Sequence, residues 1–231
     1  MRNEDTALLE TAQAAERSRN YPAAFEAWQH LASMTNRPDY FCKAGRIAQK
    51  LERWTDSETA FFDALRVDKT FSLAMVVLGS LFLKRTDGDP STNARRAKAW
   101  LEQAVAVAPS PMSLSFLGDA HNRLGDKKSA REAFRKAIEL DETDAEAYFN
   151  LGLLLADDGQ NEEAERLLRT ATHLDPNSHK AHGQLGVLLQ QLGRYSEAEA
   201  ELRCAIEIDP SDEIASLYLN RTAGGLGANR P

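Results

Sequence analysis

Cysteine is scarce in this chain: only Cys42 and Cys204 occur among 231 residues. Two cysteines so far apart define no disulfide framework, and we expect both to be reduced thiols. Long apolar runs are also missing, since no stretch approaches the roughly 20 residues that a membrane-spanning helix needs. The N-terminal segment lacks the apolar core of a secretory signal. These absences predict a cytoplasmic protein without membrane insertion.

Positive charge is not in excess. The chain has 28 Lys and Arg against 35 Asp and Glu, for a net charge of −7. A protein that binds a phosphate backbone needs a basic surface, so we expect no nucleic-acid partner. The charge is unevenly distributed, because residues 1–110 carry 15 basic and 14 acidic side chains, whereas residues 111–231 carry 13 and 21. The two halves therefore differ in the partners they can attract.

The usual signatures of catalysis are absent as well. The sequence contains no Gly-rich phosphate loop, nucleophile elbow or zinc-ligand spacing. His179 and His182 lie three positions apart, with His173 and Cys204 in neighbouring segments, so a metal site has to be considered. His173 falls near a predicted helix end, where a cation is favourable without any metal. We expect no metal, no cofactor and no catalytic residue in this chain.

The sequence does contain an internal repeat. Three columns recur along it: a glycine, then a small residue, then a bulky residue four positions after the small one. The glycine column is Gly45, Gly79, Gly118, Gly152 and Gly186; the small column is Ala24, Ser57, Ala97, Ala130, Ala164 and Ala198; the bulky column is Trp28, Phe61, Leu101, Phe134, Leu168 and Leu202. A spacing of four places the last two columns on one helix face, and small residues let a neighbouring helix approach closely.

Turn residues divide each repeat into two helices. Gly125, Gly159 and Gly193 are placed to end the first helix of their repeats in a left-handed cap. Pro109, Pro176 and Pro210 are placed to close the second helix. A helix pair of this size cannot bury its apolar faces alone, so neighbouring pairs must stack to form the core.

This period and pattern resemble the tetratricopeptide repeat, most closely over 145–178 and 179–212. The resemblance implies an all-α, right-handed α-solenoid of stacked antiparallel helix pairs. It implies a single array over 1–222, followed by a flexible tail at 223–231. We expect six repeats and a short cap helix, at 5–37, 38–71, 72–110, 111–144, 145–178, 179–212 and, for the cap, 213–222.

Two departures from the repeat carry further expectations. Repeat three is lengthened around RTDGDPSTN, residues 85–93, where a turn or longer loop is expected to join its helices. In the cap, Ile214, Leu217 and Tyr218 have helix spacing and are expected to cover the last repeat. His182 occupies a slot that holds an aromatic residue in the family, which favours a packing role over metal ligation.

The resemblance also implies that the first helices line a concave groove that takes an extended peptide or a helix. The slots facing this groove form a basic patch and a mainly apolar strip. The patch is Lys43, Arg46 and Lys50, and the strip is Val76, Met112, Phe116, Phe149, Asn150, Leu153, Lys180 and Gln184. Two alternatives stay open, namely that the strip serves only packing between repeats and that the patch is a solvated face.

A carboxylate clamp, which in this family holds chaperone C-terminal tails, is not predicted. Asn150 and Lys180 match its slots, but Ser115, Asp119 and Gln184 do not. The resemblance instead favours a non-catalytic adaptor or scaffold that binds a peptide or helix of a protein partner. Two alternatives are self-assembly into homo-oligomers and a role as accessory or regulatory subunit of a separate enzyme.

Overall fold

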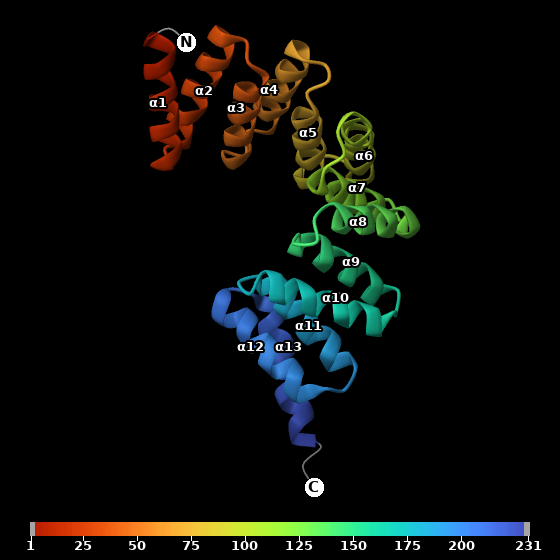
Figure 1. Cartoon of the computed structure of the whole chain (residues 1–231). Helices are drawn as coiled ribbons and strands as arrows, with labels where there is room; N and C mark the ends of the chain where they lie inside the picture. The colour runs from red at the N-terminus through yellow and green to blue at the C-terminus, as the bar shows by residue number, and fades with distance from the viewer. Residues whose placement is uncertain (1–2, 229–231) are drawn as a thin grey trace. The chain divides into compact units, whose positions relative to one another are not determined.

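The computed structural model of the chain describes the backbone of residues 3–228 and the side chains of residues 5–221. Within this range the protein is all-helical, with thirteen α-helices and no strand (Figure 1). The helices are α1 (Asn3–Arg17), α2 (Tyr21–Thr35), α3 (Pro38–Lys50), α4 (Trp54–Val67), α5 (Ser72–Lys84), α6 (Pro90–Val107), α7 (Pro111–Arg123), α8 (Lys127–Leu140), α9 (Ala145–Asp157), α10 (Asn161–Leu174), α11 (His179–Gln191), α12 (Tyr195–Ile208) and α13 (Glu213–Ala228).

Within each part of the chain, helices that are adjacent in sequence pack together, for example α3 with α4 and α11 with α12, which confirms the predicted α-solenoid of helix pairs. The first helices of repeats two to six begin at the first residue of the expected repeat, at Pro38, Ser72, Pro111, Ala145 and His179. Proline at the start of α3 and α7 fits because its fixed φ suits the first helical turn and no hydrogen bond is lost there.

The glycine column lets the two helices of a pair approach closely. A Cβ at Gly186 would lie 2.6 Å from Leu202 Cγ, and one at Gly152 would lie 3.0 Å from Leu168 Cγ. Nearer the N-terminus, Gly45 faces Phe61 and Gly79 faces Leu101 in the same way. The small-against-large pattern of the sequence is therefore a packing pattern, in which each bulky side chain fills the space that a missing Cβ leaves.

The predicted glycine caps are also confirmed. Gly125, Gly159 and Gly193 have φ angles of 78°, 73° and 76°. After α9 the Gln160 amide donates to the Leu155 carbonyl at 2.9 Å, which is the long hydrogen bond of a Schellman cap. In the first two repeats the same left-handed place is taken by Arg19 and Glu52, both at φ 57°.

The chain divides into two compact units, Met1–Asp126 and Lys127–Pro231. We call them unit 1 and unit 2. The boundary falls between α7 and α8, inside the fourth expected repeat. Unit 1 has one continuous core, whose largest fully buried side chains include Trp28, Phe61 and Phe82. The core of unit 2 is built mainly from leucines of α9, α10 and α11. A single array over 1–222 stays a prediction.

The lengthened repeat three differs from the expectation. Only residues 85–89 form a connection, because α6 begins at Pro90 and includes the rest of the expected loop. Asp89 starts this helix, since its Oδ2 accepts a 2.6 Å hydrogen bond from the Thr92 amide. Arg85 holds the connection by ion pairs to Glu58 at 2.7 Å and to Asp87 at 2.6 Å.

Helix α13 also departs from the expectation. It continues to Ala228 rather than ending at 222, because no proline interrupts the segment and each glycine costs a helix only about 1 kcal/mol. Residues 229–231 of the expected tail lie outside the described residues. The predicted packing face was wrong for Ile214 and Leu217. Ala215, 1% exposed, packs toward α12 together with Tyr218 and Leu219, because its small side chain permits close approach.

Candidate functional site

Unit 2 has two hollows beside its first helices, and Phe149 of α9 and Lys180 of α11 border both. The larger hollow, of about 520 Å³, lies between α11 and α13 and is also lined by Gln184 and Ile214. The smaller, of about 270 Å³, lies between α9 and α11 and is also lined by Asn150. Four residues of the predicted groove thus meet on one surface.

Helix α13 adds Ile214 to this surface, and Leu217 follows one turn further along the same helix; both were expected to pack over the last repeat. Ile214 is 59% exposed and Leu217 is 50% exposed. Their spacing of three places them on the same side of α13. We call the set Phe149, Asn150, Lys180, Gln184, Ile214 and Leu217 the Phe149–Lys180 surface. The signal that could have identified the last two is an apolar pair at helix spacing in the segment that follows the sixth repeat.

Asp212 fixes the start of α13. Its Oδ1 accepts a 2.9 Å hydrogen bond from the Ala215 amide, and its Oδ2 lies 3.0 Å from His179 Nδ1. Burial by itself would raise the pKa of Asp212, but the hydrogen bonds from the Ala215 amide and His179 outweigh it and hold that pKa below its usual value. A carboxylate at this position also suits the helix dipole. The orientation of Ile214 therefore depends on a charged cap.

The larger hollow combines both signs of charge with apolar surface. Lys180 is exposed at its edge, and Asp209, Asp212 and Glu213 line the side that belongs to the α12–α13 turn. Hydrogen bonds from the Ser211 side chain and amide lower the pKa of Asp209, so that carboxylate is charged at neutral pH. Such a surface can bury an apolar side chain and fix its orientation by charges on either side.

The remaining residues of the predicted strip have separate places. Leu153 is half-buried one turn beyond Phe149 on α9. In unit 1, Met112 is 49% exposed at the start of α7, and Phe116 is half-buried against the core. Val76 is only 4% exposed and leaves almost no side chain for a ligand to contact, so the packing alternative applies to this residue.

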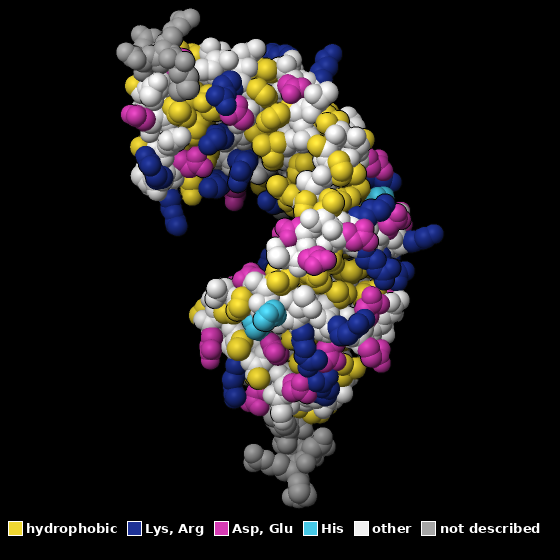
Figure 2. Space-filling view, viewed as in Figure 1, with side chains coloured by type: hydrophobic (Ala, Val, Ile, Leu, Met, Phe, Trp, Pro, Cys, Tyr) yellow, Lys and Arg dark blue, Asp and Glu magenta, His cyan; other side chains and the backbone are white. Residues whose placement is uncertain are grey.

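The basic patch of unit 1 lies on one exposed face of α3. Lys43 Nζ is 4.4 Å from the centroid of the Trp28 ring, and Lys50 Nζ is 4.9 Å from the centroid of the Tyr21 ring. Arg46 is exposed between them. Lys and Arg side chains gather over α1–α3 in the space-filling view (Figure 2).

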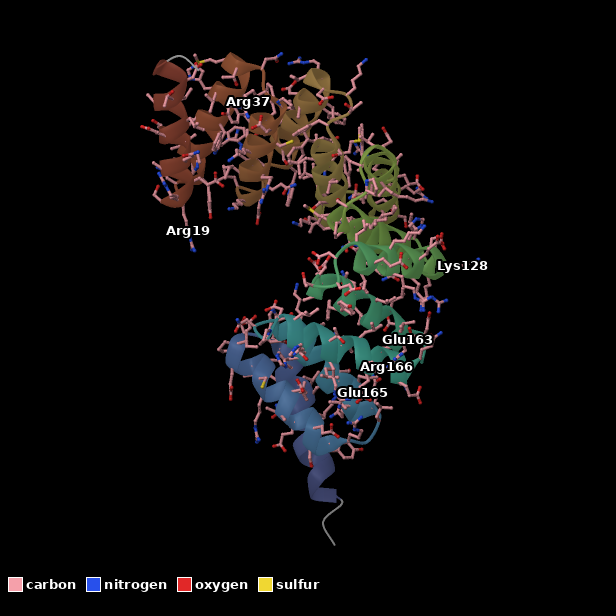
Figure 3. The ribbon with its side chains drawn as sticks, in the orientation of Figure 1. Arg19, Arg37, Lys128, Glu163, Glu165 and Arg166 are labelled. Carbon is pink, nitrogen blue, oxygen red and sulfur yellow. The ribbon has the colours of Figure 1, made fainter. Side chains whose placement is uncertain are left out.

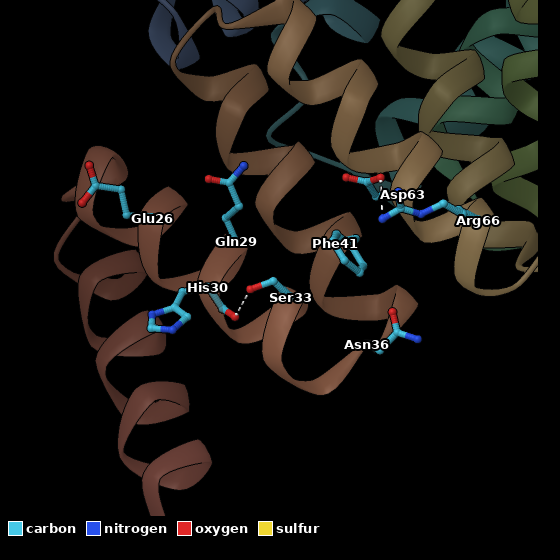
Figure 4. A pocket seen from close by; sticks show the side chains of 8 residues that line it. All are labelled: Glu26, Gln29, His30, Ser33, Asn36, Phe41, Asp63 and Arg66. Atoms are coloured by element: carbon cyan, nitrogen blue, oxygen red, sulfur yellow. Dashed lines mark hydrogen bonds and ion pairs between the residues drawn. The ribbon is translucent and has the colours of Figure 1, made fainter.

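A further hollow of unit 1 was not anticipated from the sequence. It has a volume of about 560 Å³ and lies mainly between α2 and α4 (Figure 4). Several of its polar side chains are engaged within their own helices: Ser33 Oγ donates to the His30 carbonyl at 2.7 Å, and Arg66 pairs with Asp63 at 3.2 Å. We assign this hollow no chemical role.

Two histidines of unit 2, His179 and His182, pair with carboxylates. His179 faces Asp212, as described above, and His182 Nδ1 lies 2.7 Å from Glu201 Oε2. Across the described residues, no group of three or more His, Cys, Asp or Glu side chains is arranged to hold a metal ion. Likewise, none of the helices in that range has both the length and the apolar character needed to cross a membrane.

Comparisons with known proteins agree with this architecture. Sequence models described as tetratricopeptide repeat and TPR repeat match residues 155–219 and 118–159. Comparison with curated proteins gives no match.

Solved structures share the fold. A chain of the APC/C hetero-tetramer Cut9-Hcn1 has a TM-score of 0.82 and 18% identity, covering 96% of this chain and 44% of that one. This chain therefore spans less than half of that protein chain. MamA has a TM-score of 0.59 and 20% identity, covering 75% and 92% of the two chains. YrrB, described as a TPR protein with an unusual peptide-binding site, has a TM-score of 0.58 and 22% identity, covering 86% and 100%.

The fold is that of a helix-pair repeat protein, an α-solenoid. The matching sequence models identify tetratricopeptide repeats over residues 118–219, and the thirteen helices of the described residues are consistent with about six such repeats. Such repeats in general serve protein–protein interaction and are not catalytic.

Proposed function

We propose that this protein is a non-catalytic scaffold that binds a peptide or helix of a partner protein at the Phe149–Lys180 surface. The observation that carries the proposal is the convergence of Phe149, Lys180 and Ile214, from three different helices, around one hollow of about 520 Å³. Exposed apolar side chains that gather at a hollow bordered by charged groups are typical of protein interaction sites.

The chemistry of the surface favours an amphipathic segment. Phe149, Ile214 and Leu217 offer apolar contact, while Lys180 and Asp209 offer charges of opposite sign. Three apolar anchors supply roughly 5–9 kcal/mol gross at about 1.5–3 kcal/mol each. Association and ordering cost about 4–15 kcal/mol. Contacts beyond these three are therefore needed for micromolar affinity, and the proposal includes them along α9 and α11.

The test is affinity capture with the full chain, followed by identification of the captured protein by mass spectrometry and mapping of its bound segment with synthetic peptides. Ile214→Glu is the principal variant, because Ile214 is 59% exposed and its replacement disturbs no core. Leu140→Glu is the matched control, since Leu140 is 53% exposed on α8, outside the surface. We expect Ile214→Glu to weaken binding of the mapped peptide at least about tenfold, and the control less than about twofold.

Phe149→Ala is an independent test of the same surface. Its control is Phe62→Ala, since Phe62 is 40% exposed on α4 and packs edge-on against Trp100 at 5.7 Å. Equal binding of the mapped peptide by wild type, Ile214→Glu and Phe149→Ala would contradict the proposal, even if the protein still captures a partner through another face.

Self-association is a second candidate, because Ile214 and Leu217 are exposed on α13. Apolar side chains at the end of a repeat stack can dock a second copy. Light scattering coupled to size exclusion distinguishes the two: a concentration-dependent mass that Ile214→Glu abolishes supports a homo-oligomer, whereas a constant monomer mass leaves the partner-binding scaffold.

A further inference from the structure

Unit 1 carries a second surface that is independent of the Phe149–Lys180 surface. Its cations come from three places: Arg17 in the last turn of α1, Arg19 in the turn that follows it (Figure 3), and the α3 patch. All five side chains are exposed. We call them the basic surface, which consists of Arg17, Arg19, Lys43, Arg46 and Lys50.

The cations of the basic surface form no close ion pair with any described residue. Among the described residues, no carboxylate oxygen lies within 4.0 Å of any of the five. Several arginines elsewhere are closely paired: Arg96 lies 2.6 Å from Glu58, and Arg194 lies 2.6 Å from Glu165. Five like charges on neighbouring helices without close ion pairs repel one another and are stabilised when an anionic partner approaches.

Part of the basic surface lines a hollow, so these charges surround a defined site. This hollow has a volume of about 490 Å³ and lies among the ends of α1 and α3 and the start of α2. It is lined by Gln13, Glu16, Arg17, Arg19, Tyr21 and Lys50. Glu16 is the one carboxylate of this lining, and its Oε2 accepts a 3.2 Å hydrogen bond from Trp28 Nε1. Because this hydrogen bond engages the Glu16 carboxylate, Glu16 competes less with a ligand for the cations.

Two of the lysines are held in place by aromatic rings. Lys43 lies over Trp28 and Lys50 over Tyr21, at 4.4 Å and 4.9 Å from the ring centroids. Such contacts order an otherwise flexible side chain before any ligand arrives, so less rotamer entropy is lost on binding. Trp28 itself is fully buried, which anchors Lys43 to the core of unit 1.

We propose that the basic surface binds an acidic, extended segment of a partner protein. From Lys43 to Lys50 the helix rises about 10 Å, which matches about three residues of extended chain, whose alternate side chains point to one side. The fitting motif has Asp or Glu at alternate positions over about five residues. Its first carboxylates meet Lys43 and Arg46, and its last enters the hollow between Arg17 and Lys50.

A protein segment fits better than a nucleic acid. The whole chain has a net charge of −7, which disfavours a polyanion that extends beyond the site. The basic surface is also limited in length by three carboxylates of this part of unit 1, Glu16, Asp39 and Glu52. A short acidic motif needs only the local cations.

The test measures anisotropy of a fluorescein-labelled peptide of about 12 residues that alternates Glu and Ala, with a Gln–Ala peptide of the same length as control. The full chain is titrated at about 50 mM and about 500 mM salt, because screening weakens exposed charge pairs. We expect the Glu peptide to bind at low salt, the Gln peptide not to bind, and high salt to weaken binding about tenfold or more.

Arg46→Gln combined with Lys50→Gln is expected to weaken binding of the Glu peptide about three- to tenfold. Lys128→Gln, an exposed lysine of α8 (Figure 3), is the matched control and is expected to leave binding unchanged. Ile214→Glu is also expected to leave it unchanged, which separates this inference from the proposed function. Three results would overturn the inference. They are no binding of the Glu peptide, equal effects of the double variant and the Lys128→Gln control, and tighter binding of a thymidine dodecanucleotide than of the Glu peptide.

Discussion

Gly186 of α11 packs so closely against Leu202 of α12 that a Cβ at position 186 would lie 2.6 Å from Leu202 Cγ. Gly183, one turn earlier on the same helix, has no such neighbour, since a Cβ there would lie 3.9 Å from Ala205 Cβ. The two glycines therefore have different roles. One permits the approach of two helices, and the other lies where alanine fits.

Replacing each of the two glycines by alanine is predicted to change the free energy of unfolding in opposite directions. Gly186→Ala is expected to lower the free energy of unfolding by about 1–3 kcal/mol, because Leu202 has to leave its position. Gly183→Ala is expected to raise it by about 0.5–1 kcal/mol, because alanine is the better helix former. Urea denaturation of both variants measures this, and a Gly186→Ala protein as stable as wild type would show that the close packing is absent.

The left-handed turn positions give a second prediction. Glu52 has φ 57°, which costs an L-residue about 1–2 kcal/mol, whereas glycine adopts it freely at an entropic cost of about 0.5–1 kcal/mol. Glu52→Gly is therefore expected to raise stability by up to about 1 kcal/mol. Gly159→Ala, at φ 73°, is expected to lower it by a similar amount. Thermal unfolding is the measurement, and equal shifts in one direction would contradict the cap assignment.

The two cysteines are expected to react at very different rates. Burial raises the pKa of Cys42 to about 12, so almost no thiolate forms at neutral pH, and the side chain is only 1% exposed. Cys204 is exposed, although partial burial and the nearby Glu201 also raise its pKa. A disulfide dye should label one thiol per native chain at pH 8, slowly and at Cys204, and two after denaturation. Rapid labelling of Cys42 in the native protein would contradict the packing of α3.

The cap of α13 predicts a dependence of stability on pH. The pKa of Asp212 lies below its ordinary value of 3.8 in the folded protein, so its charge stabilises the fold above that value, and this contribution is lost as the pH falls through the lower folded pKa. Asp212→Asn keeps an acceptor but loses the charge, and is expected to cost about 0.3–1 kcal/mol at pH 7.

The difference between wild type and Asp212→Asn should shrink below pH 4 (the ordinary value is 3.8). Asp126→Asn, in unit 1, is not a suitable control, because Asp126 lies 3.3 Å from His121. Asp63→Asn is preferable, since its partner Arg66 is largely exposed. A difference that stays constant from pH 7 to pH 3 would show that the charge of Asp212 does not stabilise α13.

Most of the fold could be predicted from the sequence because its signals are local or periodic. Gly159 after α9 and Pro176 after α10 mark turns without reference to anything distant. The Gly186 and Leu202 columns predict one another through the repeat itself. The division after Asp126 left no such signal, since the period of 34 residues continues across it.

The site was harder to predict, because exposure depends on how each helix is rotated. Val76 and Phe149 both occupy groove-facing slots, yet one is buried and the other borders two hollows. Ile214 was missed because its spacing fits packing as well as exposure, and the small side chain of Ala215 decides which face of α13 turns inward. Arg17 was missed because the first repeat matches the family pattern least.

Site-specific photo-crosslinking shows whether a partner contacts the Phe149–Lys180 surface. Benzoylphenylalanine is introduced at Leu217, at the Phe149–Lys180 surface, and separately at Phe62, on α4; both native side chains are partly exposed. We expect that, once a partner has been captured, irradiation joins it covalently to the chain labelled at 217 and not to the chain labelled at 62. Crosslinking at 62 without crosslinking at 217 would contradict it.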